Sequence, residues 1–347
     1  MARYSGLYSR QKDAAGKWVY IISAVVIIIF VVAFVYNRIS KSRGEDSTVS
    51  PEVQSKVVES EKVSPPVVSI KPEPEPQPEP NLPEIKHEPV VEPNSRVGEL
   101  ITKAMECINS KPARIIEART MLNEMLPLPM SRQQLQFIKA RLSELADKWL
   151  FSKVVYPEDR LCERYEVKDG DQLRAISGQF KVPYEILMEI NGIPRAEALQ
   201  SGQTIKVING PFHARVYRST YTMDLFLQNT FVRSFPVGLG KPGRETPTGL
   251  WVVKPGGKLI KPTWTDPDTG KTYEAEDPDY PLGSRWVALE GIKGDAVGKS
   301  GIAFHGTKDP NLIGTSGSRG CIRLQNGDAI LMYNLLMPGS SQVEIVE

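Results

Sequence analysis

Two side chains capable of nucleophilic and acid–base chemistry, His305 and Cys321, lie near the C-terminus of this 347-residue chain. A thiol is a good nucleophile only as a thiolate, and an imidazole can take its proton and later return it to a leaving amine. Gly320 permits a tight turn before the cysteine, so the N–H groups of Gly320 and Cys321 can form an oxyanion hole. These residues predict acyl transfer through a covalent thioester.

Two neighbours of the cysteine have predicted supporting roles. Ser318 is placed to hold the turn by hydrogen bonding to the backbone. Arg323 lies two residues after Cys321, so in an extended segment it points to the same face of the strand. There it can bind a carboxylate of an anionic substrate or tie the loop down.

The same residues have other interpretations. An isolated cysteine is most often a small buried hydrophobic residue, and an isolated histidine is more often structural than catalytic. A structural zinc site requires four ligands, usually cysteine or histidine, and this stretch offers only two. The combination favours catalysis, and the predicted reaction needs no metal and no cofactor.

A series of short motifs runs through residues 211–347. In chain order the motifs are Thr246-Pro247-Thr248-Gly249, Pro262-Thr263-Trp264, Pro281-Leu282-Gly283, Arg285-Trp286, His305-Gly306-Thr307, Ile313-Gly314 and Ser318-Arg319-Gly320-Cys321-Ile322-Arg323. In this order they resemble the L,D-transpeptidase (YkuD-type) catalytic domain. The resemblance implies a mainly β catalytic domain over residues 211–347.

The resemblance also implies roles for individual residues. Cys321 would be the nucleophile, His305 its general base and acid, and the carbonyl of Gly306 the group that orients the histidine. Arg323 and Arg319 are the candidate substrate-binding residues. The role of Arg319 is open, because many family members carry a histidine at this position.

The implied reaction joins two stem peptides of peptidoglycan. The acyl group that ends at the diamino acid of a donor tetrapeptide would be transferred to the side-chain amine of an acceptor stem. The terminal D-alanine of the donor would be lost. Two alternatives keep the enzyme and change the acceptor: water, giving an L,D-carboxypeptidase, or a lipoprotein lysine, giving a lipoprotein-to-wall attachment enzyme. A third alternative is a non-catalytic peptidoglycan anchor.

Composition indicates a modular protein. At about 150 residues per domain, 347 residues suggest two or more domains. The formal net charge is +2 and basic residues do not cluster beyond the N-terminal flank, which argues against a nucleic-acid partner. Three cysteines do not make a disulfide framework. Cys107 and Cys162 can form a disulfide in an oxidising compartment or remain buried thiols. The sequence does not indicate a protein partner.

The N-terminal region predicts a membrane anchor. Residues 18–36 are almost wholly apolar and match the roughly 20 residues that a helix needs to cross a bilayer. The run is longer than the core of a usual signal peptide, and no small-residue cleavage site follows it. Basic residues flank both ends, so the orientation rests on the implied activity. We expect a cytoplasmic N-terminus over residues 1–17 and a single-pass cell-membrane protein, with its catalytic domain in the periplasm or outside the cytoplasmic membrane.

Two segments follow the predicted anchor. Residues 44–94 form a Pro/Glu-rich linker, expected to be an extended spacer that can reach on the order of 150 Å. Residues 95–153 show apolar residues at helical spacing and predict an α-helical unit, with Ser131 as the N-cap of its last helix.

A small module is predicted over residues 163–209. Its signals are a strand from Tyr165, a turn at Asp169-Gly170-Asp171, two short helices, an Asn191-Gly192 stop and a final strand over residues 204–207. This βααβ order is similar to the LysM family, which implies binding to peptidoglycan glycan strands. The candidate glycan-binding residues are Gly170, Asp171, Leu173 and Ile193.

The predicted fold class is therefore multidomain. Within its mainly β catalytic domain, residues 221–235 alternate through Met223, Leu225 and Leu227 and predict a hairpin. His213 is expected to be structural. The segment 254–281 is rich in Pro, Gly and Asp and too long for a simple hairpin loop, so we expect it to form a flap over the site.

Overall fold

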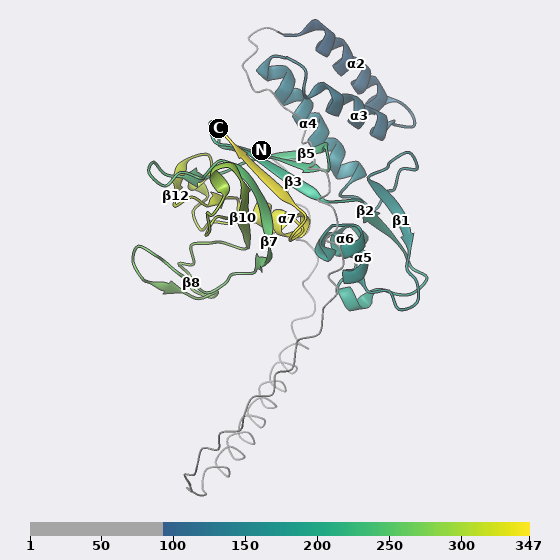
Figure 1. The fold of residues 1–347 in the computed structure, drawn as a ribbon. Coiled ribbons are helices and arrows are strands. Elements are labelled where there is room, and N and C mark those ends of the chain that lie inside the picture. The colour runs from purple at the N-terminus through teal and green to yellow at the C-terminus, as the bar shows by residue number, and fades with distance from the viewer. Residues whose placement is uncertain (1–92) are drawn as a thin grey trace, which may run out of the picture. The chain divides into compact units, whose positions relative to one another are not determined.

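The computed structural model describes residues 93–347 (Figure 1). No helix in this range is both long and apolar enough to cross a membrane. The predicted N-terminus 1–17, the predicted span 18–36 and nearly all of the linker 44–94 lie outside the described residues. These three assignments stay predictions.

The first described elements are three helices, in agreement with the helical periodicity of this region: α2 Ser95–Asn109, α3 Ile115–Met125 and α4 Arg132–Trp149. Ser131 caps α4 as expected, because its side chain accepts a hydrogen bond from Gln134 N while the Gln134 side chain bonds back to the Ser131 N–H. This capping box satisfies two donors that the first turn leaves free.

A small βααβ module follows, as the sequence predicts. Its elements are β1 Cys162–Glu166, α5 Leu173–Gln179, α6 Tyr184–Asn191, the 3₁₀ turn η1 Ala196–Ala198 and β2 Thr204–Ile208. Strands β1 and β2 pair antiparallel, and both helices turn apolar residues inward. Gly192 ends α6 at a φ of 65°, a conformation that costs a glycine little.

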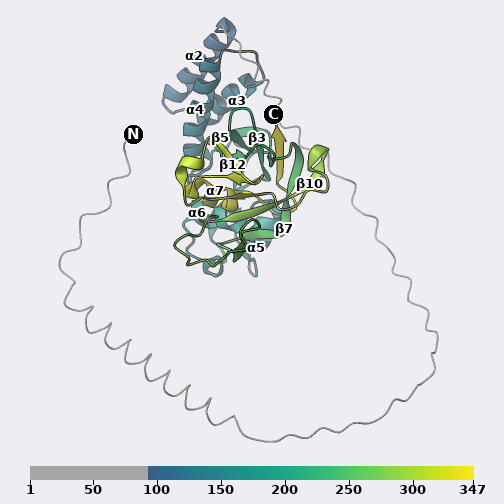
Figure 2. The same cartoon turned by 90° about the vertical axis from the view of Figure 1, so that its left-hand side faces the viewer.

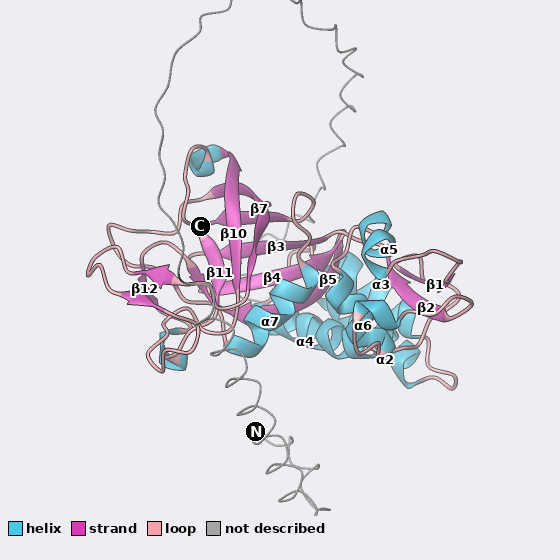
Figure 3. Ribbon diagram, turned by 90° about the horizontal axis from the view of Figure 1, so that it is seen from below, coloured by secondary structure: helices cyan, strands magenta, loops and turns pink. Residues whose placement is uncertain are grey.

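The C-terminal domain is built on one mixed eight-stranded sheet (Figure 3). In spatial order its strands are β13 Ile322–Arg323, β11 Ala303–His305, β10 Trp286–Lys293, β7 Gly249–Leu259, β14 Gln342–Val346, β3 Phe212–Tyr217, β4 Thr222–Leu227 and β5 Thr230–Pro236. The pairs β11–β13 and β14–β3 are parallel, and the others are antiparallel. The prediction of a mainly β fold for the C-terminal domain is thus confirmed.

Shorter elements complete this domain. Two small pairs are the parallel β6 Leu239–Gly240 with β12 Ser316–Ser318 and the antiparallel β8 Trp264–Thr265 with β9 Thr272–Tyr273. The 3₁₀ turns are η2 Gly294–Ala296 and η3 Pro310–Leu312. Helix α7 Asn326–Leu335 contacts β10 and β11, and β10 lies beside β7 (Figure 2).

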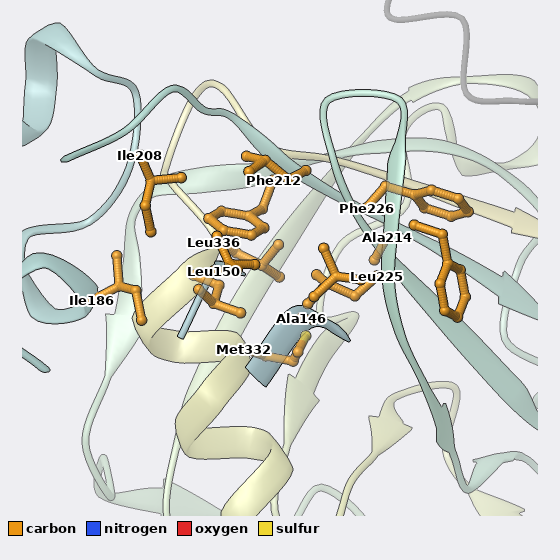
Figure 4. Close-up of a cluster of buried hydrophobic side chains, with 14 of the residues drawn as sticks. Ala146, Leu150, Ile186, Ile208, Phe212, Ala214, Leu225, Phe226, Met332 and Leu336 are labelled. Carbon is orange, nitrogen blue, oxygen red and sulfur yellow. The ribbon is translucent and has the colours of Figure 1, made fainter. Parts of the chain in front are cut away.

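The core is continuous across these elements (Figure 4). The cluster drawn there joins side chains from α4, α6, α7 and their ends, from β2 of the small module and from the eight-stranded sheet: Ala146, Leu150, Ile186, Ile208, Phe212, Ala214, Leu225, Phe226, Met332 and Leu336. Strand β4 is buried on both faces rather than on the one expected from its alternation, so Asp224 and Phe226 are also buried. The reason is that the neighbouring layers cover what would otherwise be a solvated face, with α4 against β5.

The flap differs from expectation at its start. Strand β7 continues to Leu259, so Lys254–Leu259 belongs to the sheet and not to a flap. Its register against β10 shifts between Val287 and Leu289, and Gly256 has a φ of 71°. A bulge of this kind lets a Pro-Gly-Gly stretch stay within a strand. The flap proper begins after Leu259 and contains the β8–β9 hairpin, residues 264–273, which we call the lid hairpin.

Candidate active site

Two adjacent parallel strands bring the predicted catalytic residues together. In the register of β11 and β13, Phe304 pairs with Ile322 and His305 with Arg323. Continued back by one residue, this register puts Cys321, just before β13, opposite Ala303. Side chains alternate along a strand, and Phe304 and Ile322 point into the core. His305, Cys321 and Arg323 therefore share the other face, with the Cα atoms of His305 and Cys321 roughly 8 Å apart from strand spacing.

The imidazole of His305 is fixed by two contacts. Its Nδ1 lies 2.6 Å from the carbonyl oxygen of Gly306. A carbonyl only accepts, so Nδ1 carries the hydrogen and Nε2 carries the lone pair. Trp286 lies opposite His305 in the β10–β11 register, and the two rings stack with centroids 5.7 Å apart. Tautomer and ring plane are both set by the fold.

Burial makes this imidazole a neutral base. Burial lowers the pKa of His305 to about 4, and the nearby charge of Arg323 acts in the same direction, while backbone hydrogen bonding to Gly306 and Leu282 only partly opposes that shift. The ring is therefore uncharged at pH 7 and able to accept a proton on Nε2.

The thiol of Cys321 is protonated in this structure. Its Sγ lies 3.2 Å from the carbonyl oxygen of Gly301, to which it donates. Burial raises the pKa of Cys321 to about 11, although the N–H of Ala303 and the charge of Arg323 act in the opposite direction. Among the hydrogen bonds of residues 93–347, the thiol pairs with Gly301 and the imidazole with Gly306, not with each other. A turn about the Cys321 side chain is needed before the two can exchange a proton.

Ser318 holds the turn that carries the nucleophile. Its hydroxyl donates to the carbonyl of Cys321 at 2.6 Å and accepts from the N–H of Gly320 at 3.1 Å. Gly320 has a φ of 114°, and a Cβ there would lie 2.9 Å from Ile302 Cδ1. Since Ser318 takes the N–H of Gly320, the expected two-donor oxyanion hole is not free in this structure. The N–H of Cys321 remains as the candidate donor.

The two arginines of the motif have different surroundings. Arg319 pairs with Asp266 and Asp268 of the lid hairpin, so its guanidinium is already engaged. The half-buried Arg323 forms no side-chain ion pair or hydrogen bond with any residue between 93 and 347, and burial lowers its pKa. Of the two, Arg323 is the cation available to a substrate carboxylate.

Sequence reasoning missed Asn326, which shapes the backbone after the histidine. Its Nδ2 donates to the carbonyl of Thr307 at 2.9 Å, and its Oδ1 accepts from the N–H of Ser284 at 3.0 Å. A Cβ on Gly306 would lie 2.1 Å from Asn326 Oδ1, which explains the glycine there. Asn326 begins helix α7, and nothing in its local sequence separates it from an ordinary helix start. Gly301 was also missed, because it accepts the thiol's hydrogen bond through its backbone carbonyl, which its residue type does not reveal.

A pocket of about 390 Å³ lies beside this site. Its walls come from the turn after His305, the first residue of α7 and the segments on both sides of the lid hairpin: Lys261, Glu276, Asp277, Pro278, Tyr280, Gly283, Ser284, Thr307, Lys308 and Asn326. Neither Cys321 nor His305 lines it. It neighbours the catalytic face without containing it.

The candidate glycan-binding residues of the small module divide into two kinds. Leu173 and Ile193 are buried in the module core, so their side chains are not available for contact with a glycan. Gly170 is exposed at a φ of 84°, and the carboxylate of Asp171 accepts from Tyr165 Oη and Lys168 N, each at 2.9 Å. Asp171 thus stabilises the turn after β1.

Two family models match parts of this chain. The family model described as the L,D-transpeptidase catalytic domain matches residues 211–345, and the LysM domain model matches residues 165–207. The protein named "Putative L,D-transpeptidase YkuD" in Bacillus subtilis strain 168 is 30% identical over 189 residues, which cover 52% of this chain and 97% of that protein. Its namesake in Bacillus licheniformis is 26% identical over 188 residues, with the same coverage of both chains.

A solved structure of an L,D-transpeptidase from Mycobacterium smegmatis is also similar, with 15% identity and a TM-score of 0.30. The match spans 42% of this chain and 64% of that one, less than two thirds of its length. A TM-score this low does not by itself establish a common fold. The match to nearly the full length of the Bacillus subtilis protein does establish kinship. The chain belongs to the YkuD family of L,D-transpeptidases and carries a LysM domain ahead of its catalytic domain.

Proposed function

We propose that this protein cross-links peptidoglycan stem peptides through an acyl-enzyme on Cys321. The observation that carries the proposal is the face shared by Cys321, His305 and Arg323 on strands β11 and β13. A nucleophile, a neutral base of defined tautomer and an unengaged cation on one face are what transfer of an anionic acyl donor requires.

In the first step a donor tetrapeptide binds with its scissile carbonyl beside Cys321. The thiol turns away from Gly301, His305 Nε2 takes its proton, and the sulfur attacks the carbonyl carbon of the diamino acid. The N–H of Cys321 donates to the oxyanion. The carbonyl of Gly306 accepts from Nδ1 and stabilises the imidazolium. Its Nε2 proton then passes to the amine of the terminal D-alanine, which leaves as the C–N bond breaks.

In the second step the acyl group of the thioester is transferred to an acceptor amine. His305 Nε2 takes a proton from the side-chain amine of a second stem as its nitrogen attacks the thioester carbonyl. The C–S bond breaks, and the proton on Nε2 returns to the Cys321 sulfur. The products are a new amide between two diamino acids and the free enzyme.

Arg323 is proposed to orient the donor. Its half-buried guanidinium lies opposite His305 in the parallel register. The carboxylate of Asp309 attracts it from a distance, but it forms no ion pair with a residue between 93 and 347. Burial strengthens its attraction for an anion, since fewer water molecules compete. A stem-peptide carboxylate bound there would hold the scissile carbonyl near the sulfur.

The remaining parts would bring this chemistry to its substrate. We assign glycan binding to the LysM domain and membrane attachment to residues 18–36, with the catalytic domain outside the cytoplasmic membrane. The apolar run in the sequence supports the anchor. Fractionation of cells expressing the full chain and a variant lacking residues 1–36 tests this: only the full chain should remain with washed membranes.

Product analysis with purified muropeptides tests the reaction. Mass spectrometry after incubation with a disaccharide tetrapeptide should show a cross-linked dimer that has lost one D-alanine, and Cys321→Ala should form none. A tripeptide monomer alone would assign an L,D-carboxypeptidase. A product formed only when a lipoprotein lysine peptide is added would assign the attachment enzyme. If the muropeptides are recovered unchanged with the wild-type protein, the non-catalytic anchor is favoured.

A further inference from the structure

Four charged side chains join the lid hairpin to the turn that carries the nucleophile. Arg319 Nη2 lies 2.9 Å and 3.1 Å from the carboxylate oxygens of Asp266, and its Nε lies 2.7 Å from Asp268 Oδ2. Arg244 Nη1 lies 3.1 Å from the other oxygen of Asp268. We call Arg319, Asp266, Asp268 and Arg244 the clasp. Each guanidinium meets a carboxylate of the hairpin, so charge alternates through the clasp.

On the lid side, the clasp grips a hairpin that is internally well ordered. Asp266 Oδ1 also accepts from the N–H groups of Asp268 and Thr269, so one carboxylate shapes the hairpin turn and binds Arg319. The rings of Trp264 and Tyr273 stack across the two strands with centroids 6.0 Å apart. A hairpin held this way moves as a unit, and fixing its turn fixes its position.

On the nucleophile side, the clasp is attached where backbone movement matters most. Arg319 lies between Ser318, whose hydroxyl closes the turn, and Gly320, which precedes Cys321. The carbonyl of Ser318 accepts from Lys241 N, and Lys241 begins the loop that carries Arg244. Both arginines of the clasp therefore project from segments tied to the same turn.

The geometry favours a positioning role over a general contribution to stability. The side chains of the clasp are between 14% and 45% exposed, and isolated ion pairs at such sites stabilise a fold little. Bidentate arginine–carboxylate contacts nevertheless fix the orientation of the two segments that they join. A lysine, with one point charge, cannot contact both aspartates in this planar manner.

We propose that Arg319 is a positioning residue that fastens the lid hairpin to the nucleophile's turn and so sets one wall of the donor site. This inference rests on the proposed transpeptidase function. When the clasp is broken, the donor must order the hairpin as it binds, which weakens binding and leaves the bond-making groups intact. Arg319 thus acts through the lid and not on the reacting atoms.

Limited trypsin digestion of the full protein tests the fastening without any activity assay. Lys271 lies in the lid hairpin, and cleavage after it needs the hairpin to open. Arg319→Gln should raise the rate of that cleavage roughly fivefold, and Arg319→Lys should raise it by less. The matched control is Arg114→Gln, which removes an exposed pair with Glu117 far along the chain and should leave the rate unchanged. An unchanged rate in Arg319→Gln, at an unchanged melting temperature, overturns the inference.

Acylation kinetics with a donor tetrapeptide test the consequence. Arg319→Gln should raise KM roughly fivefold with kcat within about twofold of wild type. Asp268→Asn should act in the same direction, and the double variant should lose less than the sum of the two single losses. A fall in kcat at unchanged KM contradicts the positioning role. If the wild-type protein forms no acyl-enzyme at all, the proposed function fails, whereas the digestion result still decides whether the clasp fastens the lid.

Discussion

Cys321 and His305 are both neutral at pH 7, since burial raises the pKa of the thiol to about 11 and lowers that of the imidazole to about 4. The free protein therefore keeps its proton on sulfur, bonded to Gly301. A resting thiol is protected from oxidation and alkylation, which require the thiolate. The reactive pair would form only when substrate draws the thiol toward Nε2.

The pH dependence of thiol alkylation tests this resting state. The rate of iodoacetamide labelling at Cys321 should climb steadily from pH 7 to pH 10, because the thiolate fraction grows until the pH passes a pKa of about 11. Mass spectrometry of the labelled peptide separates Cys321 from the buried Cys107 and Cys162. A plateau that is already reached near pH 6 would reveal a thiolate–imidazolium pair and contradict the neutral resting state.

Gly306 is the second residue whose identity the site dictates. In Gly306→Ala the new Cβ would meet Asn326 Oδ1 at 2.1 Å, so the carbonyl that orients His305 must move. A displacement of about 1 Å near reacting groups typically costs on the order of 100-fold in rate, and we expect that loss in acylation. Gly327→Ala is the matched control: nothing lies within 4 Å of its Cβ, and wild-type activity is expected. Equal activities in the two variants would count against the role of Gly306.

Among the elements, helix α4 and strand β4 are joined by a buried ion pair. Lys139 Nζ lies 2.7 Å from Asp224 Oδ2, and Ser234 also bonds to this carboxylate. Asp224 is fully buried, so it depends on these partners to offset the loss of water. The pair fixes the register of α4 on the sheet.

Removing one partner of this pair should be costly. Lys139→Met should lower the free energy of unfolding by about 3–5 kcal/mol, because it leaves a buried charge uncompensated. Urea denaturation of the purified protein gives this value. The double variant Lys139→Met, Asp224→Leu should recover most of the loss, since no unpaired charge remains. A single variant as stable as wild type would show that water or another cation serves Asp224.

Local signals predicted several elements correctly, and long-range pairing explains what they missed. The Asn191-Gly192 stop, the Ser131 cap and the β4–β5 hairpin depend on residues close in sequence. Strand β14, in contrast, lies between β3 and β7, and its residues pair with residues 129 positions earlier in β3 and 90 to 96 positions earlier in β7. No local pattern carries that order. The extension of β7 through Pro255 was missed because a bulge accommodates residues that usually end a strand.

The site shows the same division. Residue type and spacing correctly predicted that Ser318 bonds the turn before Cys321, and the family resemblance correctly predicted that the carbonyl of Gly306 bonds the His305 ring. The catalytic roles of Cys321 and His305 stay predictions. The engagement of Arg319 with the lid, the acceptor at Gly301 and the bracing by Asn326 depend on contacts between segments far apart in the chain. Leu173 and Ile193 were predicted to bind glycan because they lie beside turns, but packing buries both side chains.

At the scale of the whole molecule, two buried histidines make stability depend on pH. Burial lowers the pKa of both His213 and His305 to about 4, whereas in the unfolded chain they titrate near 6.5. Between these values the unfolded state binds more protons, so the free energy of unfolding should fall as the pH drops from about 6.5 to 4.

Denaturant titrations at pH 7, 5.5 and 4.5 check this trend. His213→Asn should flatten part of it, because asparagine can accept the hydrogen bond from Gln342 N without titrating. Lowered carboxylate pKa values, such as that of Asp171, contribute only at more acidic pH. Stability that stays constant from pH 7 to 4.5 would contradict neutral burial of the two rings.

Intact-protein mass spectrometry after brief incubation with a donor tetrapeptide tests the central claim most directly. The account predicts a mass gain equal to the donor minus its terminal D-alanine, located on Cys321 by peptide mapping, absent in Cys321→Ala and formed far more slowly in His305→Gln. An adduct on another residue, or the same adduct in Cys321→Ala, would contradict it.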